Sequence, residues 1–247
     1  MSSRWPLVSE NVSSFERTSE SIVLSKDEAC LPAFLAANSE SSPRFILKRI
    51  LDYCLAAVAI VLLAPLMLLV ALAISWESSG PVFFRQQRMG QRGKLFRIWK
   101  FRTMVENAEK LVADLESQNE SEGGGLFKIK CDPRVTRLGR FLRRTSLDEL
   151  PQLFNVLTGD MSLVGPRPLP IRDCSMLTEL HPEGFRRRLQ VMPGVTGLWQ
   201  VSGRSRLGAA KMIELDCEYI ERWGILYDLR ILARTVFVLL FDRGSAC

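Results

Sequence analysis

An uncharged run of 24 residues, 53–76, constrains the folding of this chain more than any other feature. As a straight helix rising ~1.5 Å per residue, it would be roughly 36 Å long, against about 30 Å for the hydrocarbon core of a bilayer. A buried helix of a soluble protein is the alternative, but such helices are seldom this long and this uniformly apolar. The run therefore predicts a membrane helix.

Pro65 lies near the middle of this run. Because proline removes a backbone donor and clashes with the preceding turn, we expect the helix to kink or break there. Basic residues flank the run on both sides, and positive charge favours the cytoplasmic side of a membrane. A re-entrant hairpin over residues 45–78 would keep both flanks in the cytoplasm, so the charge pattern favours it. A single crossing stays open as the alternative.

The rest of the composition narrows the class of protein. Residues 1–44 are serine-rich and aperiodic, which predicts a disordered polar leader, and the apolar run comes too late for a signal peptide. Six scattered cysteines indicate reduced thiols in a cytosolic setting, and a single histidine, His181, disfavours a zinc site. The net charge of +6 predicts an anionic partner: acidic lipid, a phosphorylated substrate or nucleic acid.

We expect residues 79–247 to form a cytoplasmic domain, and the fold class to be α+β, mainly α. Alternating apolar and basic residues around Gly90 and Gly93 predict a β-hairpin with one cationic face. That face would meet lipid phosphates or a substrate pyrophosphate, or would be a solvated edge. A glycine run at 123–125 predicts a flexible loop. Apolar periodicity and helix-start signals predict helices over residues 105–115, 134–144, 151–157, 207–223 and 226–241, some of them amphipathic and suited to a bilayer surface.

Asp148 and Glu149 form the candidate site, with Arg143 before them and Arg167 after them. Nearby cations keep a nucleophilic or metal-binding carboxylate ionised and offset the charge of a phosphate partner. A structural explanation competes, because Ser146-x-x-Glu149 matches a capping box at a helix N-terminus. On these residues alone capping is the commoner explanation.

Several stretches together resemble one family, the bacterial sugar transferases that are monotopic phosphoglycosyl transferases. Each motif alone is weak, whereas all of them in this order are specific. The resemblance runs from about residue 43 to the C-terminus and corresponds to the minimal catalytic form, although Ala64 replaces the serine that often precedes the proline. The matching stretches are Lys48-Arg-Ile-Leu-Asp52, Pro65, Lys100-Phe-Arg-Thr-Met104, Asp132-Pro-Arg-Val-Thr136, Ser146-Leu-Asp-Glu-Leu-Pro-Gln152, Gly165-Pro-Arg-Pro168 and Pro193-Gly-Val-Thr-Gly-Leu-Trp-Gln200.

The resemblance implies a transfer of sugar 1-phosphate from a UDP-sugar to polyprenyl phosphate, normally undecaprenyl phosphate, with release of UMP. It implies that Asp148 is the nucleophile, forming an aspartyl-phosphosugar intermediate, and that Glu149 helps to hold Mg²⁺. The reaction would begin exopolysaccharide, capsule, O-antigen or glycoprotein glycan assembly at the bacterial inner membrane, with the catalytic domain on the cytoplasmic side. The residues expected to bind phosphate or substrate are Arg143, Arg167, Lys100, Arg102, Trp199, Gln200 and Arg204.

The expected partners are thus a UDP-sugar, polyprenyl phosphate and membrane lipid, not nucleic acid, and a homo-oligomer stays open. Two other functions compete. One is a membrane-anchored basic protein that binds lipid or nucleic acid without catalysis. The other is a single-span glycosyltransferase that passes the sugar without its phosphate and releases UDP. The sequence leaves the identity of the sugar and of the surface glycan open.

Overall fold

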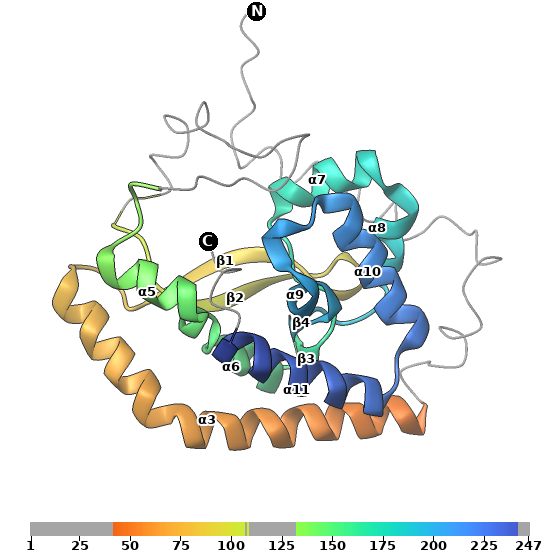
Figure 1. Ribbon diagram of the computed structural model, residues 1–247, viewed down its shortest axis with the longest axis horizontal. Helices are drawn as coiled ribbons and strands as arrows, with labels where there is room; N and C mark the ends of the chain where they lie inside the picture. The colour runs from red at the N-terminus through yellow and green to blue at the C-terminus, as the bar shows by residue number, and fades with distance from the viewer. Residues whose placement is uncertain (1–41, 107, 109–131, 242–247) are drawn as a thin grey trace, which may run out of the picture.

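The computed structural model describes residues 42–106, 108 and 132–241 (Figure 1). Residues 1–41 of the predicted leader, most of the helix predicted at 105–115 and the glycine run at 123–125 lie outside the described residues. The described part is mostly helical with a small β-hairpin, as predicted. In chain order the elements are α3 (Pro43–Glu77), β1 (Phe83–Met89), η2 (Gln91–Gly93), β2 (Leu95–Phe101), α5 (Arg137–Thr145), η4 (Leu147–Glu149), α6 (Gln152–Leu157), β3 (Ser162–Val164), α7 (Ile171–Leu180), α8 (Pro182–Leu189), β4 (Gly194–Thr196), α9 (Leu198–Ser202), η5 (Arg204–Arg206), α10 (Ala209–Arg222) and α11 (Ile225–Phe241).

Helix α3 is 35 residues long and forms the floor of the molecule in Figure 1. Ser42 caps it by accepting a hydrogen bond from the backbone N–H of Phe45, and Pro43 occupies the first turn, where its missing N–H is harmless. Pro65 lies inside the helix, which bends and continues. Pro65 therefore bends α3 without breaking it, because the helix resumes beyond the proline.

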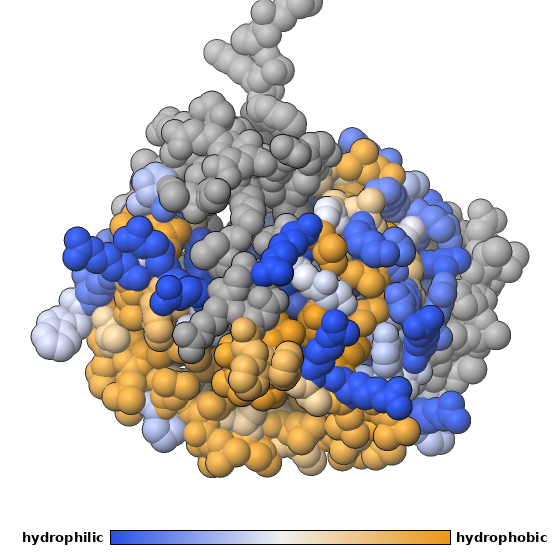
Figure 2. All heavy atoms as spheres, viewed as in Figure 1, coloured by the Kyte–Doolittle hydropathy of each residue, from blue (hydrophilic) through white to orange (hydrophobic). Residues whose placement is uncertain are grey.

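The outer surface of α3 is strongly apolar. Of the helices in the described residues, α3 alone is long and apolar enough to cross a membrane, by length and composition. Only 17% of its most apolar window is buried inside the protein, which is far less than the core helix of a soluble domain would show. Figure 2 shows apolar side chains gathered along the underside of the molecule, over α3. This exposed apolar surface is compatible with membrane association.

Strands β1 and β2 pair antiparallel, from Phe83 opposite Phe101 to Met89 opposite Leu95, and confirm the predicted hairpin. Part of its cationic face is occupied by a stacked pair, since the Arg85 guanidinium lies 3.4 Å from the centre of the Trp99 ring. Beside β2, the Asn155 side chain of α6 accepts a hydrogen bond from the Trp99 N–H and donates one to the Arg97 carbonyl, both at 2.9 Å. This clamp holds α6 against the edge of the hairpin.

A second, two-stranded sheet is parallel and was not predicted. It joins β3 to β4, with Ser162 opposite Gly194 and Val164 opposite Thr196. The backbones approach so closely beyond β3 that a Cβ on Gly165 would lie 2.4 Å from the Met192 carbonyl oxygen. Glycine is therefore required at this position, and the crossing fixes where the following Pro166-Arg167-Pro168 segment begins.

The predicted basic helix is α5, which begins at Arg137, three residues later than predicted. Thr136 explains the difference, because its hydroxyl accepts a hydrogen bond from the Gly139 N–H and starts the helix. Helices α6, α10 and α11 agree with the helices predicted at 151–157, 207–223 and 226–241. Helices α7 and α8 were not predicted.

A buried polar network joins α3 to the rest of the molecule. Lys48 Nζ donates to Asp228 Oδ2 at 2.6 Å and to the Val164 carbonyl at 3.4 Å. The Tyr219 hydroxyl lies 2.9 Å from Asp228 Oδ1 and 3.0 Å from the same carbonyl. The start of α3 is thereby fixed to the end of β3, directly before Gly165.

Candidate active site

Asp148 and Glu149 lie in η4, a single 3₁₀ turn between α5 and α6. Ser146 ends α5 in the left-handed conformation, with φ of 56°, and its side chain makes no capping hydrogen bond to η4. Its hydroxyl instead accepts a hydrogen bond from Arg204 Nη1 at 2.9 Å. The capping-box explanation of these residues is therefore wrong, and the two carboxylates are available for another role.

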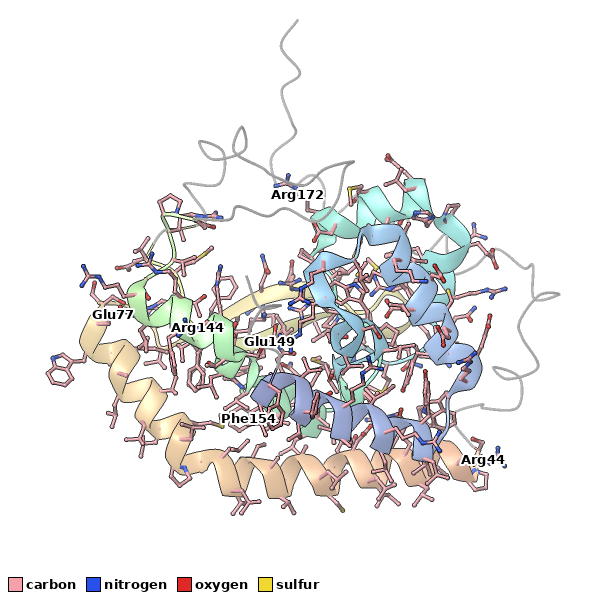
Figure 3. The ribbon with its side chains drawn as sticks, viewed as in Figure 1. Arg44, Glu77, Arg144, Glu149, Phe154 and Arg172 are labelled. Carbon is pink, nitrogen blue, oxygen red and sulfur yellow. The ribbon has the colours of Figure 1, made fainter. Side chains whose placement is uncertain are left out.

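Glu149 joins two cations from distant parts of the chain. Its Oε1 accepts hydrogen bonds from Lys100 Nζ of β2 and from Arg167 Nη2, each at 2.7 Å. Arg167 Nη1 lies farther from Oε2, at 3.4 Å. Burial alone would raise the pKa of Glu149, but Arg167 and Lys100 outweigh it and hold that pKa well below its ordinary value. Figure 3 shows Glu149 near the inner end of α5.

Asp148 has a different environment although it is adjacent in sequence. Its side chain is buried, and its Oδ2 lies 3.9 Å from Lys100 Nζ. Burial and the charge of Glu149 raise the pKa of Asp148, against the opposing effects of Lys100, Arg143 and Arg167. A carboxylate with a raised pKa is more basic, and hence more nucleophilic, than an ordinary one. The neighbouring carboxyls therefore have opposite pKa shifts, which is typical of sites where they have different roles.

Arg143 reaches this site from α5. Its Nε donates a hydrogen bond to Thr103 Oγ1 at 2.9 Å, and its charge lowers the pKa of Asp148. The close approach of α5 depends on Gly139, where a Cβ would lie 2.1 Å from the Thr103 carbonyl oxygen. Helix packing at Gly139 therefore brings Arg143 towards Asp148.

Arg102 is engaged elsewhere. Its guanidinium donates to the carbonyl oxygens of Ser79 and Ser78, at 2.6 and 2.7 Å, and holds the segment that follows α3. The structure therefore places this predicted substrate-binding residue at the end of α3 and apart from the contacts of Glu149.

The three predicted substrate-binding residues between positions 193 and 204, which are Trp199, Gln200 and Arg204, have different environments. Trp199 and Gln200 are each 5% exposed in α9, with Trp199 in the main hydrophobic core and Gln200 Nε2 donating to the Val195 carbonyl at 3.2 Å. Arg204 alone of these three predicted residues contacts the η4 region, through Ser146. The structure thus brings Lys100, Glu149 and Arg167 together directly, whereas Trp199 and Gln200 are buried in α9.

Asn155 lies beside the candidate site and was not predicted from the sequence. Its clamp on β2 fixes the strand that carries Lys100 relative to the turn that carries Glu149. A polar residue within the apolar stretch Leu153-Phe-Asn-Val-Leu157 was the available signal, since asparagine is unfavourable inside a helix unless its side chain has a specific partner.

The acidic pair fits a metal that is shared with a substrate. Within residues 42–106, 108 and 132–241, no group of three or more His, Cys, Asp or Glu side chains could hold a metal ion by itself. Mg²⁺ commonly uses one or two carboxylates and takes its other ligands from phosphate oxygens and water. Asp148 and Glu149 supply that number, and the contact of Glu149 Oε2 with Arg167 Nη1 is a long one, at 3.4 Å.

The fold and site define a class: a protein with a long exposed apolar helix, whose paired carboxylates and cations suit phosphoryl transfer. Residues 43–242 match the bacterial sugar transferases. The chain is 38% identical over 203 residues to the exopolysaccharide production protein ExoY of Sinorhizobium fredii, covering 81% of this chain and 88% of ExoY. This protein belongs to the bacterial sugar transferase family.

Two further relatives have names that state a reaction. The undecaprenyl-phosphate galactose phosphotransferase of Salmonella typhimurium is 41% identical over 210 residues, which is 84% of this chain and 43% of that protein. The UDP-glucose:undecaprenyl-phosphate glucose-1-phosphate transferase of Escherichia coli is 43% identical over 197 residues, which is 78% of this chain and 40% of that protein. The chain therefore spans about two fifths of the length of these two relatives.

Proposed function

We propose that this protein transfers a sugar 1-phosphate from a UDP-sugar to undecaprenyl phosphate and releases UMP. The observation that carries the proposal is the buried Asp148 beside a glutamate that two cations, Lys100 and Arg167, hold ionised. The names of the Salmonella and E. coli relatives, which state undecaprenyl-phosphate sugar phosphotransfer, support it.

In the first step, an Asp148 carboxylate oxygen attacks the phosphorus that bears the sugar. The bond from this phosphorus to the bridging oxygen breaks, and UMP departs with that oxygen and its electron pair. Asp148 then carries the sugar phosphate as an acyl phosphate. Two anions must approach one another in this step, so the charges of Arg143, Arg167 and Lys100 lower the barrier by offsetting their repulsion.

In the second step, a phosphate oxygen of undecaprenyl phosphate attacks the same phosphorus. The bond between this phosphorus and Asp148 breaks, which regenerates the carboxylate and leaves the sugar joined to the lipid through a diphosphate. One nucleophile thus serves two substrates in turn, one soluble and one in the membrane.

We propose that Glu149, with Asp148, holds Mg²⁺ together with the donor diphosphate. When bound, the ion would neutralise charge on the phosphate oxygens. The contacts of Lys100 and Arg167 prepare Glu149 for this role, because they keep it ionised in spite of its burial.

We propose that α3 is re-entrant and that the protein lies on the cytoplasmic face of the bacterial inner membrane. The bend in α3 and basic residues at both flanks support this, and exposed apolar residues at the end of α11 would rest in the same leaflet. In a cysteine-free background, Arg44→Cys and Ser79→Cys should both react with an impermeant thiol reagent only after the cytoplasmic side is opened. Labelling from opposite sides would indicate a single crossing.

The function is tested by incubating the purified protein with a panel of UDP-sugars and undecaprenyl phosphate, and by identifying the released nucleotide. We expect UMP, and we expect Asp148→Asn to abolish its release while Asp160→Asn, a matched change at a partly exposed aspartate, leaves it intact. Release of UDP would support the glycosyltransferase that passes the sugar without phosphate. Release of neither nucleotide would support a non-catalytic lipid-binding protein.

A further inference from the structure

Arg188 of α8 and Asp216 of α10 form a buried ion pair. Arg188 Nη2 lies 2.9 Å from Asp216 Oδ2, and the two side chains are 4% and 2% exposed. The same Nη2 donates a hydrogen bond to the backbone carbonyl of Arg167 at 2.7 Å. A continuous set of contacts therefore runs from Asp216 through Arg188 to Arg167, and from the Arg167 guanidinium to Glu149.

The backbone around Arg167 is held mostly by hydrogen bonds that its carbonyl oxygens accept, including one at Pro168 from Arg88 Nη1 and one at Leu169 from the Met89 N–H. Pro166 and Pro168 flank Arg167 and have no N–H to donate, so the segment is held mainly through its carbonyl oxygens. The Pro166 carbonyl accepts from the Gly194 N–H at 2.9 Å, and the Arg167 carbonyl accepts from Arg188. The orientation of the Arg167 peptide thus depends on a side chain from α8.

The ion pair is a poor source of stability. Two buried charges lose their hydration, and their attraction repays this only when every polar group is satisfied. Arg188 Nε makes no hydrogen bond within the described residues, and burial raises the pKa of Asp216 to about 6. Apolar side chains of similar volume would fill this space at little or no loss of stability. The Arg188–Asp216 ion pair therefore contributes more to the position of Arg167 than to stability.

We propose that Arg188 and Asp216 are positioning residues for the proposed sugar-phosphate transfer. Asp216 orients the Arg188 guanidinium, and Arg188 fixes the Arg167 carbonyl, so that the Arg167 guanidinium faces both Glu149 and the donor phosphate. The inference rests on the proposed function, but it assigns a role to two residues whose contacts lead to Asp148 and Glu149 only through Arg167 in the part of the chain that the structure describes.

The first experiment compares Arg188→Met with Arg187→Met. Arg187 is the preceding residue of α8, and its ion pairs with Glu183 and Glu221 involve exposed glutamates. We expect Arg188→Met to lower kcat for UMP release on the order of 10-fold or more through loss of orientation, and Arg188→Lys to recover part of it. Arg187→Met should match the wild type. Equal activity of both methionine variants would overturn the proposal.

The second experiment asks whether Arg188 acts through Arg167. In an Arg167→Ala background, adding Arg188→Met should cause little further loss, because the group that it positions is already absent. If the two losses multiply, Arg188 acts independently and the positioning role is wrong.

A third variant separates positioning from folding. Arg188→Met combined with Asp216→Leu should keep or raise the thermal midpoint while the loss of kcat persists. Full activity in this double variant would overturn the inference and leave the proposed function standing. If the wild type releases no UMP, the proposed function fails, and the affinity of the protein for UDP is measured instead. Weaker UDP binding by Arg188→Met but not by Arg187→Met supports the positioning role. Equal UDP binding by the two variants contradicts it.

Discussion

Lys100 Nζ lies 2.7 Å from Glu149 Oε1 and 3.9 Å from Asp148 Oδ2, so one ammonium group serves two adjacent carboxylates unequally. The close contact helps to keep Glu149 ionised. The longer contact to Asp148 only partly opposes the effect of burial, which raises the pKa of Asp148. This unequal sharing is the physical basis for different roles at neighbouring positions.

The two carboxylates should have opposite effects on stability at pH 7. The pKa of Asp148 is raised, so its charged form is disfavoured in the folded state, and Asp148→Asn should raise the thermal midpoint by the equivalent of about 1 kcal/mol. Glu149→Gln removes the counter-charge of Lys100 and Arg167 and should lower the free energy of unfolding by about 1–3 kcal/mol, which lowers the thermal midpoint. Thermal unfolding of the detergent-solubilised variants measures both.

The contribution of Glu149 to stability should also depend on pH. The pKa of Glu149 is depressed, so its stabilising contribution is present above the unfolded pKa and is lost as the pH falls through the folded one. Acidification should therefore narrow the difference in thermal midpoint between the wild type and Glu149→Gln. A difference that is constant across the acid range would argue against the ionised cluster.

Lys100→Met should move the acid limb of the kcat profile to higher pH. Lys100 lowers the pKa of Asp148, and the proposed nucleophile must be ionised, so removing the ammonium raises the pH at which activity appears. Lys94→Met, at an exposed lysine of the same hairpin, is the control and should leave the limb in place. An unshifted limb in Lys100→Met would mean that Asp148 does not control it.

Much of the fold could be predicted because its elements follow local patterns. The alternation around Gly90 and Gly93 predicts the β1–β2 hairpin, and apolar periodicity predicts α5, α10 and α11. The β3–β4 pair could not be predicted, since each strand has three residues and the pairing depends on Gly165 and Gly194, which are distant in sequence. A kink or break of α3 at Pro65 was predicted, but a proline alone does not determine whether a helix bends or breaks.

The sequence predicts which residues form the candidate site better than it predicts how their side chains contact one another. Lys100, Glu149 and Arg167 belong to motifs, yet only the fold shows that both cations share one carboxylate oxygen. Arg102 belongs to the same motif as Lys100, but it lies just beyond the end of β2, and its side chain donates to the carbonyl oxygens that follow α3. Arg188 and Asp216 were missed, since their partners are made by packing of α8 on α10.

The attachment of α3 depends on Lys48. Lys48→Met leaves Asp228 buried without its cation and should destabilise the protein by about 3–5 kcal/mol. Adding Asp228→Asn should restore part of the loss, because the uncompensated charge is removed. Lys211→Met, at an exposed lysine, should change little. Thermal midpoints measure all three, and a Lys48→Met protein as stable as the wild type would contradict a structural role for the network.

The most direct test of the account is to trap the intermediate. The protein is mixed with a UDP-sugar radiolabelled in its sugar, without the lipid acceptor, then quenched, digested and analysed by mass spectrometry. We expect a sugar phosphate attached to Asp148, absent from Asp148→Asn and discharged when undecaprenyl phosphate is added before the quench. Release of UMP on addition of the lipid by a protein that never carries the label, or carries it on another residue, would contradict it.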